Sequence, residues 1–305
     1  MVKPDDSSLN NESLIVVEKR AIEILNKADV WNRFPTPVDD VLDAAKLKVI
    51  RRSSIFDPDT MAAFLKQKAK EAGRALKSAL TKVFGIYDAD DEVIHIDDSV
   101  TASKQNFLKL HETGHHQIPA HKRTFKLFQD CLETLSPEIS DQFEREANNF
   151  ARIVLFQNDT FKKLAADMPN GIKTPMGLSK KFGSSIYAAC REYVRTHHRS
   201  CVLYALEPIT NIGADGRSAE VRRIEVSEKF KTHFGTPNCT IINFKHPLWE
   251  VLPFGRMRGP TEVFLKDLNG TRHRCIGEAF DSTHNVFLLI FPEEELTSTS
   301  IWLRD

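Results

Sequence analysis

The sequence predicts an α+β protein whose helices fill the first two thirds of the chain and whose strands dominate the last third. Apolar residues recur at the spacing of amphipathic helices up to about residue 198. After Pro208 the pattern changes to short β-branched and aromatic runs separated by turn residues. We therefore expect four parts: a disordered tail at 1–14, a first domain at 15–160, a helical segment at 161–205 and a second domain at 206–305.

Composition limits the classes of protein to which the chain can belong. Its 305 residues carry 42 basic and 42 acidic side chains, so no global attraction to nucleic acid or anionic lipid follows. No apolar run approaches the roughly 18 residues of a transmembrane helix, and the polar start MVKPDDSSLNNES lacks the apolar core of a secretory signal. The five cysteines are scattered and include no C-x-x-C pair, which argues against a zinc knuckle or a disulfide framework. We expect a cytoplasmic protein.

The first 100 residues are expected to alternate between helices and short strands. One amphipathic helix spans Val17–Trp31, and a second begins at Pro37 with Thr36 as its N-cap. Short strands are expected at 47–51, 84–87 and 93–96, the last two as a hairpin. Residues 61–82 form a predicted helix with six basic side chains and one acidic one. Such a helix could contact phosphate, although a solvated face is the commoner meaning of a charge run.

The stretch FLKLHETGHHQI, residues 107–118, contains the motif H-E-x-x-H as His111, Glu112 and His115. On a helix, residues four apart lie one above the other, so both imidazoles face one point. Neutral imidazole is a common ligand of zinc. Glu112 lies one step round the helix, where its carboxylate could take a proton from a water on the metal. Two helical histidines are also common as ordinary core or surface residues, so a metal site needs a third ligand.

The third ligand is expected from a helix at 141–155. Apolar residues at helical spacing give this segment a buried stripe, and Glu144 borders it. Glu146, about 200° further round the helix, should face away. Asn148 lies one turn after Glu144, where it could orient a ligand histidine. The alternative for Glu144 is a surface carboxylate paired with a neighbouring arginine of the same helix.

These residues resemble the ImmA/IrrE family of metallopeptidases. HETGH followed by EREANNFARIVL is similar to the family's HExGH and E-x-E-A-N-x-F-A segments, and the resemblance is specific over about 35–160. It implies a zincin-like metallopeptidase core in which His111, His115 and Glu144 hold Zn²⁺ and Glu112 is the catalytic residue. The last hundred residues are similar in layout to the GAF-like sensor domain of IrrE-type members.

The resemblance also implies a substrate. Peptidases of this family typically cut a helix-turn-helix transcriptional repressor and thereby switch on DNA-damage, mobile-element or anti-phage operons. We therefore expect a zinc-dependent endopeptidase that derepresses an operon in response to a stress signal, with the C-terminal domain as sensor. We hypothesise single-stranded DNA as the activator, with the basic helix at 61–82 as one contact surface. No membrane partner is expected.

A helical pair leaves room for another function. Residues 178–190 have the cadence of a helix-turn-helix with a tight turn at Gly183. If this pair bound DNA, the recognition helix would open with Ser184, Ser185, Tyr187 and Arg191. The main rival function is therefore a DNA-binding transcriptional regulator with a structural metal site, although such a site is normally closed by four protein ligands. An adaptor that has lost activity is a third alternative, and the intact Glu112 counts against it.

Two further side chains receive candidate roles. Cys131 lies in the connection between the two site helices and could occupy the open zinc position, which would hold the enzyme latent. A buried apolar cysteine is the commoner case. Tyr87, in the first hairpin strand, is a candidate for assisting the oxyanion, whereas His95 in the second strand is expected to be structural.

Overall fold

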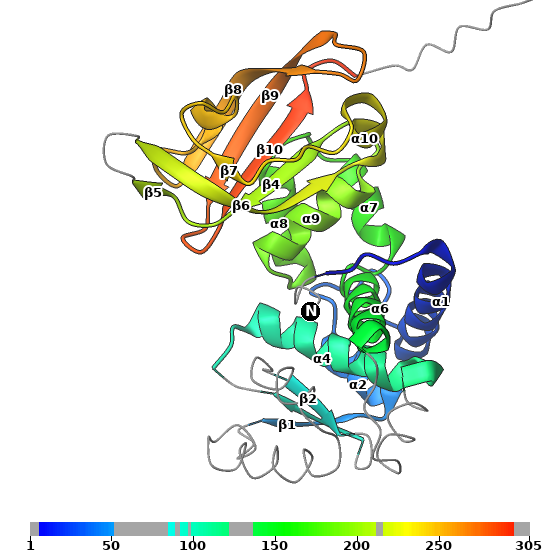
Figure 1. The fold of residues 1–305 in the computed structure, drawn as a ribbon. Coiled ribbons are helices and arrows are strands. Elements are labelled where there is room, and N and C mark those ends of the chain that lie inside the picture. Colours follow the sequence, from blue (N-terminus) through cyan, green and yellow to red (C-terminus); the bar gives the residue numbers. More distant parts are fainter. Residues whose placement is uncertain are drawn as a thin grey trace, which may run out of the picture. The chain divides into compact units, whose positions relative to one another are not determined.

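The computed structural model is a mixed helix-and-sheet structure (Figure 1) and describes residues 6–51, 85–88, 92–96, 99–121, 137–211 and 216–295. The chain divides into two compact units: Met1–Thr160 with Lys181–Ser184, and Phe161–Lys180 with Ser185–Asp305. The predicted basic helix at 61–82 and Cys131 lie outside the described residues. In the described part of the chain, no helix combines the length and apolar character needed to span a bilayer.

The first unit is built on the helices α1 (Asn11–Ala28), α2 (Val38–Ala45), α4 (Ala102–Gln117) and α6 (Pro137–Leu155). Helix α6 packs against α1 and α4, and α2 packs against the same two helices. Helix α1 begins six residues before the predicted start, because the side chain of Asn10 accepts a hydrogen bond from the backbone N–H of Ser13 (2.8 Å). Residues 11–14, which the sequence assigned to the tail, are therefore helical.

The prediction that Thr36 caps α2 was wrong. The N-cap position of α2 is Pro37, which makes no side-chain cap bond. The hydroxyl of Thr36 is buried and donates instead to the carbonyl of Leu155 (2.7 Å), at the last turn of α6. The final carbonyls of a helix have no partner within the helix, so this hydroxyl satisfies α6 and leaves the start of α2 uncapped.

A three-stranded sheet supports the motif helix. Strand β3 (Val93–Ile96) lies between β1 (Lys48–Arg51), to which it is parallel, and β2 (Gly85–Asp88), to which it is antiparallel. The predicted hairpin of β2 and β3 is confirmed, and α4 packs against both of its strands. The backbone of Tyr87 lies in β2, while its side chain is outside the described part of the structure.

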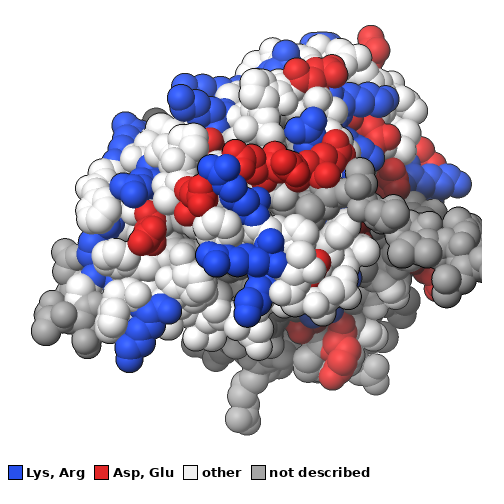
Figure 2. Space-filling view, turned by 90° about the horizontal axis from the view of Figure 1, so that it is seen from above, with Lys and Arg blue, Asp and Glu red and all other residues white. Residues whose placement is uncertain are grey.

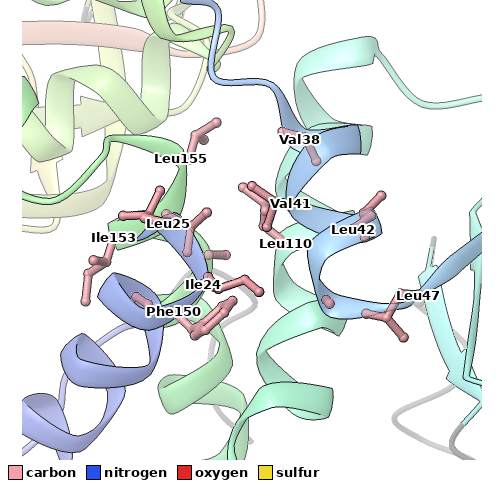
Figure 3. Packing of buried hydrophobic residues seen from close by; sticks show 14 of the residues in the cluster. Ile24, Leu25, Val38, Val41, Leu42, Leu47, Leu110, Phe150, Ile153 and Leu155 are labelled. Atoms are coloured by element: carbon pink, nitrogen blue, oxygen red, sulfur yellow. The ribbon is translucent and has the colours of Figure 1, made fainter. Parts of the chain in front are cut away.

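Buried apolar side chains from all four helices fill the space between them (Figure 3). Leu110 of α4 and Phe150 of α6 are both fully buried in this core, and a large side chain contributes about 1.5–3 kcal/mol when it is removed from water. The two helices approach closely at Gly114, where an added Cβ would lie 3.2 Å from both the Cα of Ala147 and the Cβ of Phe150. The core therefore fixes the separation of α4 and α6 at the position of the H-E-x-x-H motif.

The second unit contains an antiparallel sheet with the strand order β5-β6-β4-β10-β9-β8, and β7 also pairs with β6. Its strands are β4 (Val202–Leu206), β5 (Thr210–Asn211), β6 (Arg217–Val226), β7 (Ile241–Ile242), β8 (Met257–Lys266), β9 (Arg272–Asp281) and β10 (Val286–Pro292). The helices α7 (Asp159–Ala166), α8 (Lys173–Phe182), α9 (Ile186–Thr196) and α10 (Glu228–Phe234) accompany them, with a 3-10 turn at Trp249–Val251. The change from helix to strand after Pro208 is confirmed, and this curled sheet is compatible with a sensor domain.

We predict that Gly114→Ala lowers the stability of the protein, although alanine favours a helix by about 1 kcal/mol over glycine. The added methyl group must displace the backbone of α6, and overpacking of this kind costs about 1–3 kcal/mol. Gly177→Ala in α8 is the matched control, because nothing lies within 4 Å of its added Cβ. Thermal unfolding should show a lower Tm for the first variant and a higher Tm for the control. An equal rise in both would contradict the close approach of α4 and α6.

Candidate metal centre

Helices α4 and α6 bring the three predicted ligands together. One ligand atom each of His111, His115 and Glu144 lies within 4.8 Å of the others. The two Nε2 atoms are 3.2 Å apart, and the Glu144 carboxylate oxygens lie 3.3 Å from Nε2 of His111 and 3.6 Å from Nε2 of His115. Both imidazoles are buried, whereas 49% of the Glu144 side chain is exposed. The cluster is therefore accessible from the side of the carboxylate.

The geometry of this cluster fits a zinc ion. Ligand atoms at about 2.0–2.2 Å from zinc and at tetrahedral angles lie about 3.3–3.6 Å from one another. The three observed separations, 3.2, 3.3 and 3.6 Å, fall in or next to this range. Two histidines and one glutamate are also a donor set of catalytic zinc sites, which keep one position open for water. In the described ranges, no fourth acidic, histidine or cysteine side chain joins the cluster.

The outer nitrogen of each histidine is also engaged. Nδ1 of His111 lies 3.0 Å from Oδ1 of Asn148, and Nδ1 of His115 lies 3.0 Å from Nδ1 of His121. Asn148 is thus in the orienting position that the helical spacing predicts. Zinc-binding histidines usually hold such a partner at the second ring nitrogen, since it fixes the ring and its tautomer. The arrangement leaves both Nε2 atoms directed at Glu144.

Electrostatics at the site follow from burial and from Glu144. Burial lowers the pKa of His111, but the hydrogen bond and charge of Glu144, together with the charge of Glu112, outweigh it and raise that pKa to about 9. Burial and the neighbouring His111 lower the pKa of His115 well below its ordinary value. Burial raises the pKa of Glu144, but its hydrogen bond to His111 and the nearby histidines lower it to about 2. Glu144 is therefore an anion at neutral pH, and zinc would compete with a proton for His111.

Glu112, the predicted general base, adjoins the ligand cluster in sequence. It follows His111 directly on α4 and is buried, with 8% of its surface exposed. Its negative charge contributes to the raised pKa of His111, which indicates that its carboxylate lies close to that ring. Glu112 thus acts electrostatically on His111 and is not a member of the ligand cluster.

Sequence reasoning missed two features of this centre. His121 was not expected to take part, and Glu146 was not expected to be buried. Glu146 is not among the ligands, as predicted, but it does not face solvent: its carboxylate lies 2.8 Å from Nε2 of His121. Its angle from Glu144 round the helix does not determine its surroundings, because the segment that carries His121 packs on that side of α6. The Pro119 that follows the end of α4 was the available signal, because it predicts a change in chain direction just before His121.

Comparisons with known proteins show what this chain resembles. Residues 70–193 match the peptidase M78 family model, which is described as the IrrE N-terminal-like domain. The match includes both site helices, supports the ImmA/IrrE family and is consistent with metallopeptidase activity.

Among solved structures, one named "Mycobacterium tuberculosis transcriptional regulator" matches with a TM-score of 0.50 and 12% sequence identity, over 94% of this chain and 93% of that chain. At this identity the likeness shows the fold alone. A search of the curated proteins found no match.

Proposed function

We propose that this protein is a zinc-dependent endopeptidase, in which His111, His115 and Glu144 hold the metal and Glu112 acts as general base. The observation that carries the proposal is the convergence of two Nε2 atoms and one carboxylate at the separations of a tetrahedral zinc site. The match of residues 70–193 to the peptidase M78 family supports it independently.

In the proposed reaction, Glu112, Glu144 and Asn148 have different roles. Zinc bound here would lower the pKa of its water towards 7 and polarise the substrate carbonyl. Glu112 accepts the proton of the attacking water and delivers it to the leaving amine, and its burial keeps bulk water away from that transfer. The exposed side of Glu144 leaves room for a peptide to approach. Asn148 holds the ring of His111 in place during these steps.

We predict that Glu112→Gln lowers the rate of peptide cleavage by about 10²–10⁴-fold, the usual contribution of a general acid–base residue. Zinc content should stay at the wild-type level, because Glu112 is not a member of the ligand cluster. Glu138→Gln is the matched control, since Glu138 is an exposed carboxylate on α6, and it should cleave at the wild-type rate. Cleavage by the zinc-loaded Glu112→Gln protein at the wild-type rate would refute the assigned base.

The substrate that we propose is a helix-turn-helix transcriptional repressor, whose cleavage derepresses an operon under stress. This part of the proposal depends on the resemblance to ImmA/IrrE peptidases, and the IrrE description of the matched model supports it. A cytoplasmic peptidase of this kind needs restraint, and the antiparallel sheet of the second unit is compatible with a sensor domain that provides it. A small helix-turn-helix protein encoded beside this gene is the first substrate to test.

Single-stranded DNA is the activator that we propose, on the basis of the basic segment 61–82. On the face shown in Figure 2, acidic side chains gather in a band and basic side chains are scattered around it, so the described residues form no extended basic surface on that face. We predict that single-stranded DNA accelerates repressor cleavage and that the acceleration weakens as salt concentration rises. Cleavage rates that are equal with and without DNA at every salt concentration would dismiss this activator.

The rival function, reading of DNA by the helical pair α8 and α9, has less support from the packing of α9. Arg191 is buried, and its Nε donates to the Glu225 carboxylate on β6 (2.7 Å). The ring of Tyr187 lies 5.3 Å from the guanidinium group of Arg191 and 5.2 Å from that of Arg222 on β6. Ser185 caps the helix by accepting from the backbone N–H of Ala188. Two of the side chains expected at the start of a recognition helix, Tyr187 and Arg191, thus hold α9 on the sheet, which favours a packing role.

A further inference from the structure

A second histidine–carboxylate pair, His121 and Glu146, contacts the candidate metal centre at His115. His121 follows the end of α4 and is fully buried, with its ring stacked on Phe143 at a centroid distance of 4.0 Å. Its Nδ1 lies 3.0 Å from Nδ1 of His115, and its Nε2 lies 2.8 Å from the Glu146 carboxylate. The other carboxylate oxygen of Glu146 accepts from the side-chain amide of Gln142 (2.8 Å). These contacts form one continuous chain of hydrogen bonds from Gln142 and Glu146 on α6, through His121, to the ligand His115.

When His121 is neutral, only one arrangement of protons satisfies this chain. An ionised carboxylate can only accept, so Nε2 of His121 must donate to Glu146. Neutral His121 then has an unprotonated Nδ1, which must accept from Nδ1–H of His115. His115 therefore has its proton on Nδ1 and a free lone pair on Nε2, the atom that faces His111 and Glu144. The direction of every hydrogen bond in the chain is set by the charge of Glu146.

The other ligand histidine shows the same result by different means. The amide nitrogen of Asn148 donates to the backbone carbonyl of Asp6 (2.7 Å), which leaves its Oδ1 to accept from Nδ1–H of His111. In its neutral form each ligand ring thus has its proton on Nδ1 and an unprotonated Nε2. The amide of Asn148 fixes the tautomer of His111, and His121 with Glu146 fixes the tautomer of His115.

We propose that His121 and Glu146 are positioning residues of the metal centre: they fix the tautomer and the ring orientation of His115 so that its Nε2 can bind zinc. This inference depends on the proposed zinc site. Neither residue is a member of the ligand cluster, and the contact of His121 with the cluster is through His115. Partners of this kind commonly change metal affinity by about 10–100-fold when they are removed.

The test compares two substitutions of His121 in the full-length protein. His121→Phe keeps an aromatic ring for stacking on Phe143 but removes both hydrogen bonds. His121→Gln retains one acceptor and one donor. We expect zinc to bind roughly 10–100-fold more weakly to the phenylalanine variant, and the glutamine variant to bind more nearly like wild type. His197→Phe is the matched control, because His197 contacts the ring of Tyr193 at 4.5 Å in the other unit, and its zinc affinity should be unchanged.

A second variant and a second measurement keep the test decisive if His121→Phe does not fold. The amide of Glu146→Gln can donate to Nε2 of His121, which permits the opposite proton arrangement. The ¹⁵N chemical shifts of His115 in metal-free protein should show the Nδ1–H tautomer in wild type and a shift towards Nε2–H in Glu146→Gln.

Two results would overturn the proposal: wild-type zinc affinity in His121→Phe, or equally weak binding in the phenylalanine and glutamine variants. If the wild-type protein itself bound no zinc, the metal site would fail, and the tautomer of His115 would decide the role of His121 separately. An Nε2–H tautomer in wild type would contradict that role.

Discussion

The close packing of α4 on α6 is the constraint on which the site depends. His111 and His115 come from α4 and Glu144 from α6. The distance between the histidines and the carboxylate is therefore set by how closely the two helices approach. Leu110 and Phe150 bury the seam, and Gly114 supplies no side chain where the backbones come together. Metal–ligand distances tolerate errors of only about 0.2 Å. A close-packed core is stiff enough to hold that tolerance, because its side chains have few alternative arrangements.

Burial then makes each polar group of the site dependent on its partners. Buried charged or polar groups are costly unless they are hydrogen-bonded or paired. The centre contains buried imidazoles and the carboxylates of Glu112, Glu144 and Glu146. The histidine–carboxylate contacts offset the cost of burial and fix the orientation of each ring. The same burial lowers the pKa of His115, which favours the neutral ring that a zinc ligand requires. The helix packing that buries His115 therefore also favours the protonation state in which it can bind zinc.

Much of this site was predictable from local periodicity. The spacing of His111 and His115, and the buried stripe beside Glu144, are properties of single helices, and the structure brings those side chains together. His121 could not be predicted in this way, because its place beside His115 depends on a reversal of the chain after α4. For the same reason the capping role assigned to Thr36 was wrong: its hydroxyl donates to a carbonyl 119 residues away in sequence. Contacts between distant segments decide such cases.

The N-terminal segment shows the same limit of sequence reasoning. Its polar composition predicts a tail, yet the backbone carbonyls of Asp6 and Ser7 accept from the side-chain amides of Asn148 and Asn149 on α6, each at 2.7 Å. Leu9 also packs against the core. Polar side chains on a distant helix thus order a segment whose own sequence has little tendency to fold.

The most direct measurement of the central claim is a crystal structure of the zinc-loaded protein with anomalous diffraction recorded on both sides of the zinc absorption edge. The account predicts one strong peak about 2.0–2.2 Å from Nε2 of His111, Nε2 of His115 and a carboxylate oxygen of Glu144, with no fourth protein ligand. A zinc peak at another place, or a peak at this place enclosed by four protein side chains, would contradict it.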